Sequence, residues 1–137
     1  MTRQCAQRGF TILESLVALL LFAFGILGLI GMQATAARVA ADAQYRAEAT
    51  MWADKLISQM RTDNPASLSA DYSEGGGKYA AWLVEVQDAA AGGLPGAMAN
   101  PPTVEIAGTP PVVTVTIFWT GPGETVPHRY VTVATMN

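Results

Sequence analysis

The first long run of apolar positions extends from Phe10 to Met32, and Glu14 is the only ionisable residue within it. A helix of this length spans roughly 30–35 Å at about 1.5 Å per residue, enough for the hydrocarbon core of a bilayer. A domain of this size could hardly bury such a helix on every side. The pattern therefore predicts a membrane-inserting helix at residues 10–32.

The apolar pattern changes after this run, but helical character continues. Residues 33–61 contain neither proline nor glycine and are rich in alanine, the best helix former. Apolar residues at helical spacing form one stripe, which consists of Tyr45, Ala49, Trp52, Ala53, Leu56 and Met60. Asp63-Asn64-Pro65 is a typical helix end. We therefore predict one continuous helix from about Thr11 to Arg61, amphipathic over residues 33–62, with an ion pair between Asp42 and Arg46 on its surface.

Residues 66–102 are rich in glycine and proline and predict a loop that contains a short helix. This helix is expected over Lys78–Ala91, with Trp82, Val86 and Ala90 facing inward.

From Thr103 onward the apolar period is two, which predicts antiparallel strands over residues 103–137. Thr103–Ala107 is expected to form an edge strand. Residues 113–119 and 131–134 alternate apolar with other residues on either side of a connection at Thr120–Glu124. One face of this sheet is expected to receive the amphipathic helix. The fold class is therefore α+β, a long N-terminal helix packed on a small antiparallel sheet, and residues 33–137 form the head.

Three glycines, Gly25, Gly28 and Gly31, interrupt the apolar run at three-residue intervals. Small residues allow close helix packing in membranes. Glycine also costs helix stability, up to about 1 kcal/mol against alanine, so the same residues would permit local stretching or unwinding. Both interpretations, packing and helix flexibility, stay open.

Charge sets the expected orientation of the chain. The short segment Met1–Gly9 carries Arg3 and Arg8 and no acid, which predicts a cytoplasmic leader and an exported head. The only cysteine, Cys5, lies in this leader, so the head cannot form a disulfide. Ala34-Thr35-Ala36 would also suit a conventional signal cleavage site, although that interpretation leaves Glu14 without a purpose. The formal net charge of −3 offers no basic surface for nucleic acid.

Signals of catalysis are weak. His128 is the only histidine, and beside Arg129 in a proline-flanked connection it is expected to be solvent-exposed. The acidic residues show no paired spacing typical of acid–base catalysis. We therefore expect no catalytic residues, no metal site and no cofactor, and hence no enzyme.

The N-terminus resembles the class III signal of type IV pilins and their relatives. The resemblance rests on Gly9-Phe10-Thr11-Ile12-Leu13-Glu14 after a basic leader and before an apolar run, with Ile12-Leu13 a mild permutation of the usual pattern. It implies that a prepilin peptidase cuts after Gly9 and methylates the new N-terminal Phe10. It also implies an assembly charge pair between Glu14 and the Phe10 amine of a neighbouring subunit.

The first half of the chain is further similar to minor pilins of the type IV pilus modification protein PilV family. The similar segments are Leu16–Leu19, Gly25–Leu29, Gln33–Ala36 and Met60–Pro65. This resemblance implies an inner-membrane subunit that enters an extracellular pilus and helps to prime or modify its assembly, with roles in adhesion and twitching motility. Its partners would be other minor pilins, the major pilin, the prepilin peptidase and the inner-membrane assembly platform. Two alternatives stay open, a type II secretion pseudopilin and an uncleaved single-pass membrane protein.

Overall fold

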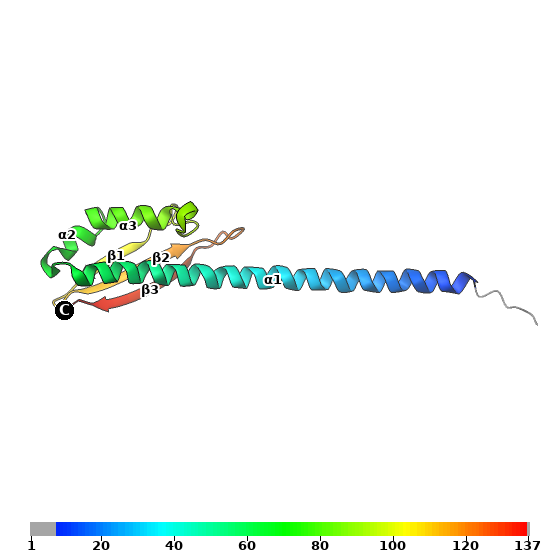
Figure 1. The fold of residues 1–137 in the computed structure, drawn as a ribbon. Helices are drawn as coiled ribbons and strands as arrows, with labels where there is room; N and C mark the ends of the chain where they lie inside the picture. The colour runs from blue at the N-terminus through cyan, green and yellow to red at the C-terminus, as the bar shows by residue number, and fades with distance from the viewer. Residues whose placement is uncertain (1–7, 137) are drawn as a thin grey trace, which may run out of the picture. The chain divides into compact units, whose positions relative to one another are not determined.

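The computed structural model describes residues 8–136, and the chain divides into two compact units between residues 40 and 41. The expected leader, with Arg3 and Cys5, lies outside the described residues except for its last two positions. One helix, α1 (Arg8–Thr62), supplies the described part of the first unit and continues into the second (Figure 1). The predicted continuous helix is confirmed, because no proline interrupts these residues and alanine and leucine favour the helical conformation.

The second unit is built on a three-stranded antiparallel sheet in the order β1–β2–β3. Its strands are β1 (Thr103–Ala107), β2 (Val112–Trp119) and β3 (His128–Thr135). The helical stripe packs against this sheet as predicted: Ala49, Trp52, Ala53, Leu56 and Met60 are buried, and Tyr45 is half-buried beside them. Facing them are the buried residues of β2, namely Val113, Val115, Ile117 and Trp119. The α+β architecture is confirmed.

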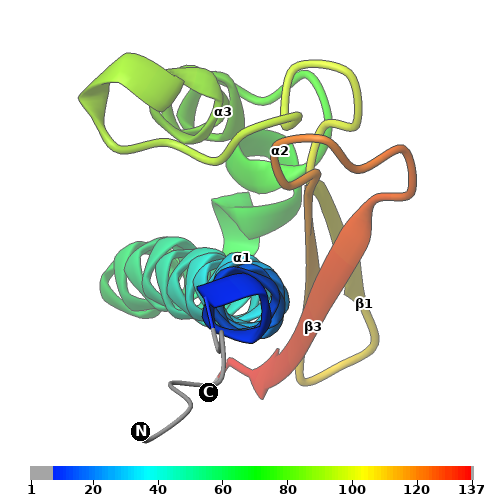
Figure 2. The ribbon, with the colours of Figure 1, turned by 90° about the vertical axis from the view of Figure 1, so that its right-hand side faces the viewer.

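Two further helices complete the second unit, α2 (Leu68–Tyr72) and α3 (Gly77–Gln87). They lie on the same side of the sheet as the C-terminal half of α1 (Figure 2). Trp82 of α3 is buried, and its Nε1 donates to the carbonyl oxygen of Trp52 at 3.1 Å. This bond between a buried indole and a backbone carbonyl joins α3 to α1.

The predicted inward face of α3 is correct for Trp82 and Val86 and wrong for Ala90. The helix ends at Gln87, and Ala89–Ala91 forms a separate 3-10 turn in which Ala90 is exposed. The cause is local: the Asp88 carboxylate accepts hydrogen bonds from the N–H groups of Ala90 and Ala91, at 3.1 and 3.3 Å. This cap starts a new turn in place of continuing α3.

The alternation along β3 is present, but its valines face away from the core. Val131 and Val133 are 47% and 61% exposed. Val131 pairs with Thr116 and Val133 with Thr114, and residues opposite each other in a sheet share a face. The outward threonines of β2 therefore place these valines outward, whereas Thr132 and Ala134 turn towards the helix side.

Candidate functional site

The first turns of α1 carry the predicted processing residues. Gly9 and Phe10 are already helical, and Phe10 is 73% exposed. Phe10 and Glu14 are four residues apart, so they lie on the same face of α1. Together with apolar neighbours they line a shallow depression along the helix, whose other residues are Leu13, Val17, Ala18 and Leu21. Glu14 forms no ion pair with any side chain that the structure describes.

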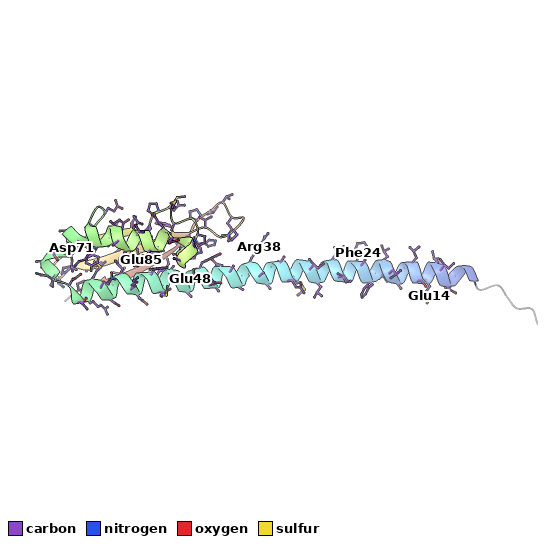
Figure 3. The ribbon with its side chains drawn as sticks, turned by 45° about the horizontal axis from the view of Figure 1, so that its top comes forward. Glu14, Phe24, Arg38, Glu48, Asp71 and Glu85 are labelled. Atoms are coloured by element: carbon purple, nitrogen blue, oxygen red, sulfur yellow. The ribbon has the colours of Figure 1, made fainter. Side chains whose placement is uncertain are left out.

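The apolar half of α1 is exposed throughout. Every described side chain from residue 10 to residue 40 is exposed, and large apolar groups project from all sides of the helix, Phe24 among them (Figure 3). By length and composition this helix could cross a membrane. Burying each Leu, Ile or Phe side chain is worth about 1.5–3 kcal/mol, so such a surface favours an apolar environment, in lipid or among other helices.

Two hydroxyl side chains within this half bond to their own helix. Ser15 Oγ donates to the Thr11 carbonyl oxygen at 2.8 Å, and Thr35 Oγ1 donates to the Gly31 carbonyl oxygen at 3.2 Å. Such bonds to the preceding turn satisfy the hydroxyl group without water. Glu14 is the only ionisable residue within residues 10–32, and its charge requires an external partner or water.

The three glycines of the apolar half are helical in the structure. A Cβ atom at Gly25, Gly28 or Gly31 would meet nothing within 4 Å. No contact among residues 8–136 therefore requires glycine there, and the role of these glycines in packing or flexibility stays a prediction.

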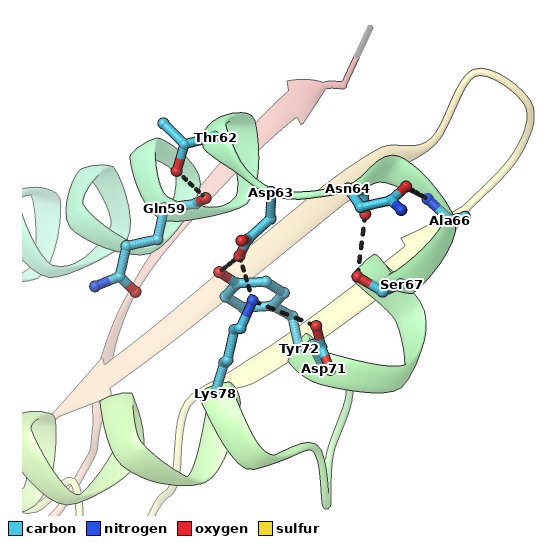
Figure 4. Close-up of polar contacts among 9 residues, drawn as sticks. All are labelled: Gln59, Thr62, Asp63, Asn64, Ala66, Ser67, Asp71, Tyr72 and Lys78. Atoms are coloured by element: carbon cyan, nitrogen blue, oxygen red, sulfur yellow. Dashed lines mark hydrogen bonds and ion pairs between the residues drawn. The ribbon is translucent and has the colours of Figure 1, made fainter.

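The head carries a polar cluster where α1 ends (Figure 4). Asp63 Oδ2 accepts a hydrogen bond from the Tyr72 hydroxyl and lies 2.7 Å from Lys78 Nζ. Lys78 also pairs with Asp71 at 3.4 Å. The Lys78 hydrogen bond, with help from Tyr72, lowers the pKa of Asp63, and the Asp63 bond raises the pKa of Lys78. Burial, together with the Asp63 bond, raises the pKa of Tyr72 to about 12. The cluster therefore links the end of α1 to α2 and α3. The ammonium group of Lys78 is paired with two carboxylates, those of Asp63 and Asp71.

His128 is partly exposed, but it begins a strand and does not lie in the connection where the sequence places it. It is the first residue of β3, its side chain is 38% exposed, and its ring stacks on Trp119 with centroids 5.6 Å apart. Two carboxylates flank the ring, Glu124 from the β2–β3 loop and Asp42 from α1. Asp42 therefore faces His128, and its predicted ion pair with Arg46 is wrong. No sequence signal indicated this cluster, because Asp42 and His128 lie near opposite ends of the head sequence.

Residues 5–30 match the family model of the prokaryotic N-terminal methylation motif. This motif is typical of type IV pilins and pseudopilins, which are structural subunits, and it coincides with Gly9, Phe10, Glu14 and most of the exposed apolar helix. No curated protein and no solved structure matches the chain. Among residues 8–136, no group of three or more His, Cys, Asp or Glu side chains is placed to hold a metal ion.

Proposed function

We propose that this chain is a minor pilin of the PilV type, stored in the inner membrane and incorporated into a type IV pilus, where it helps to prime or modify assembly. The observation that carries the proposal is the methylation motif at the start of a helix whose first half is exposed and apolar. A helix of this kind has two suitable environments, the lipid in which the subunit is stored and the bundle of helices in a fibre. The head, a folded α+β unit, would be the exported part.

Glu14 has a specific role in this proposal. Cleavage after Gly9 would create a positive amine on Phe10, and in an apolar bundle an unpaired carboxylate or amine is costly. Pairing Glu14 of one subunit with the amine of its neighbour removes both costs and sets the axial register of the two helices. The absence of an ion pair at Glu14 among the described residues supports a partner outside this part of the chain.

The proposed partners are the prepilin peptidase, the inner-membrane assembly platform, the major pilin and other minor pilins. The leader would stay in the cytoplasm and the head in the periplasm until assembly carries the subunit out of the cell. Pseudopilins of type II secretion share the motif, so gene neighbours are informative: pilus genes beside this one support the proposal and secretion genes contradict it.

The direct test is mass spectrometry of the N-terminus of the membrane-extracted protein. We expect a mature chain that begins at Phe10, carries one N-methyl group and contains no cysteine. Replacing Gly9 by Leu should abolish the cut, whereas Gly25→Ala, a matched glycine change outside the cleavage site, should leave it unchanged. A chain that begins near Ala37 would indicate conventional signal cleavage, and an intact N-terminus would indicate an uncleaved membrane anchor. Either result would overturn the pilin proposal.

A further inference from the structure

The loop between β2 and β3 is organised around the side chain of Glu124. The Glu124 N–H donates to the Gly121 carbonyl oxygen at 3.0 Å, and Glu124 Oε2 accepts from the Gly121 N–H at 3.2 Å. A Cβ atom at Gly121 would lie 2.8 Å from the same carboxylate oxygen. Glycine at this position therefore allows the carboxylate to fold back over its own loop.

The same carboxylate also reaches the imidazole of His128. Glu124 Oε2 lies 2.8 Å from His128 Nε2, while His128 Nδ1, on the other side of the ring, lies 3.6 Å from Asp42 Oδ1. The first distance is that of a hydrogen bond, and the second is too long for one. The ring thus stands between the loop and α1, bonded to the loop and close to α1 without a bond.

A neutral imidazole cannot donate a hydrogen bond to both carboxylates. It has one N–H group and one lone pair, whereas an imidazolium has two N–H groups. If the single proton is on Nε2, the lone pair of Nδ1 faces Asp42; if it is on Nδ1, a lone pair faces Glu124. Asp42 Oδ1 is in fact buried without a hydrogen-bond partner, which is the condition that a second N–H would relieve. Stacking on the Trp119 indole also suits a cationic ring.

We propose that His128, Asp42 and Glu124 form a proton-operated latch in which protonation of His128 ties the β2–β3 loop to α1. The imidazolium would keep its bond to Glu124 and gain a second one to Asp42 Oδ1, which moves within hydrogen-bond distance of Nδ1. Among residues 8–136, the ionisable groups that pair with the ring are these two carboxylates, one from α1 and one from the β2–β3 loop, whereas β2 contributes the uncharged indole of Trp119. Arg38, Arg46 and Arg129 are the nearest cations in sequence, and none forms an ion pair with either carboxylate among residues 8–136. The latch lies wholly within the second unit and is independent of the proposed pilin function.

The test is backbone amide hydrogen exchange of the full-length protein in detergent micelles at pH 7.5 and pH 5.5. Protection factors, corrected for the intrinsic effect of pH on exchange, are compared for the loop amides of residues 121 and 123–126, since Pro122 has no N–H group. Histidine is the type of side chain whose charge most commonly changes between pH 5 and 8. We expect protection in the loop to rise about three- to tenfold at the lower pH, the factor that one net hydrogen bond contributes.

Three variants separate the latch from other causes of pH dependence. Asp42→Asn keeps the shape of the side chain without its charge, and His128→Phe keeps a ring on Trp119 without a titrating proton. Both should lose most of the rise in loop protection. Glu105→Gln, a matched change of an exposed carboxylate on β1, should keep it. The latch is refuted if the wild-type protein shows no rise, or if Asp42→Asn or His128→Phe retains the full wild-type rise.

Discussion

Truncation of Leu56 tests whether α1 packs on the sheet as a structural element of the head. Leu56 has no exposed surface, and it lies in the stripe that faces the buried residues of β2. Leu→Ala changes at such sites cost about 2–5 kcal/mol, because lost transfer energy adds to the cost of a cavity. We expect Leu56→Ala to lower the free energy of unfolding by about 3 kcal/mol, a large part of the ~5–15 kcal/mol that stabilises a typical domain. For a domain of this size the melting temperature should fall by about 12–24 °C.

The assay is urea unfolding of a fragment that begins at Gln33, which we expect to be soluble and folded because it retains the whole core. Its three tryptophans, Trp52, Trp82 and Trp119, are all buried, so their fluorescence reports loss of this core. Met51→Ala is the matched control, because Met51 lies on the same helix and is 54% exposed. The control should change stability by no more than about 0.5 kcal/mol. If Leu56→Ala costs no more than Met51→Ala, the packing argument is refuted.

The remaining predictions concern Glu14 and the polar cluster. Glu14→Ala should preserve cleavage after Gly9 and membrane insertion but prevent incorporation into fibres. Glu14→Gln should be incorporated almost as poorly, because the amide carries no charge. Wild-type levels of Glu14→Ala in sheared fibres, measured against membrane fractions, would exclude the charge-pair role. Since the pKa of Asp63 is lowered in the folded state, its contribution to stability is present above pH ~4 and is lost as the pH falls below that value. Asp63→Asn should therefore reduce the loss of unfolding free energy below pH ~4. A loss equal to that of the wild type would contradict this role of Asp63. The pKa of Tyr72 is raised to about 12, so its contribution is full below pH ~10 and is lost as the pH rises towards 12. Tyr72→Phe should weaken that alkaline loss, and a loss equal to that of the wild type would show that Tyr72 does not cause it.

Local signals in the sequence were sufficient to predict the main helix and strands. The continuous α1, its buried stripe and the edge strand β1 all follow from the periodicity of apolar residues and from the positions of proline and glycine. These features depend on neighbours within one or two turns, which the sequence places next to one another. The motif that contains Gly9 and Phe10 is likewise a property of contiguous residues, and the family model matches it over residues 5–30.

Contacts between distant segments were decided only by the tertiary structure. Alternation along β3 shows that Val131 and Val133 share a face, but only pairing with Thr116 and Thr114 turns that face outward. Likewise, Lys78 becomes part of a cluster because α2 and α3 return to the end of α1. His128 lies between two carboxylates because the sheet brings the start of β3 beside Asp42. The sequence determines the elements and their apolar faces through short-range periodicity, whereas register and helix packing determine which polar groups meet, because those groups are far apart along the chain.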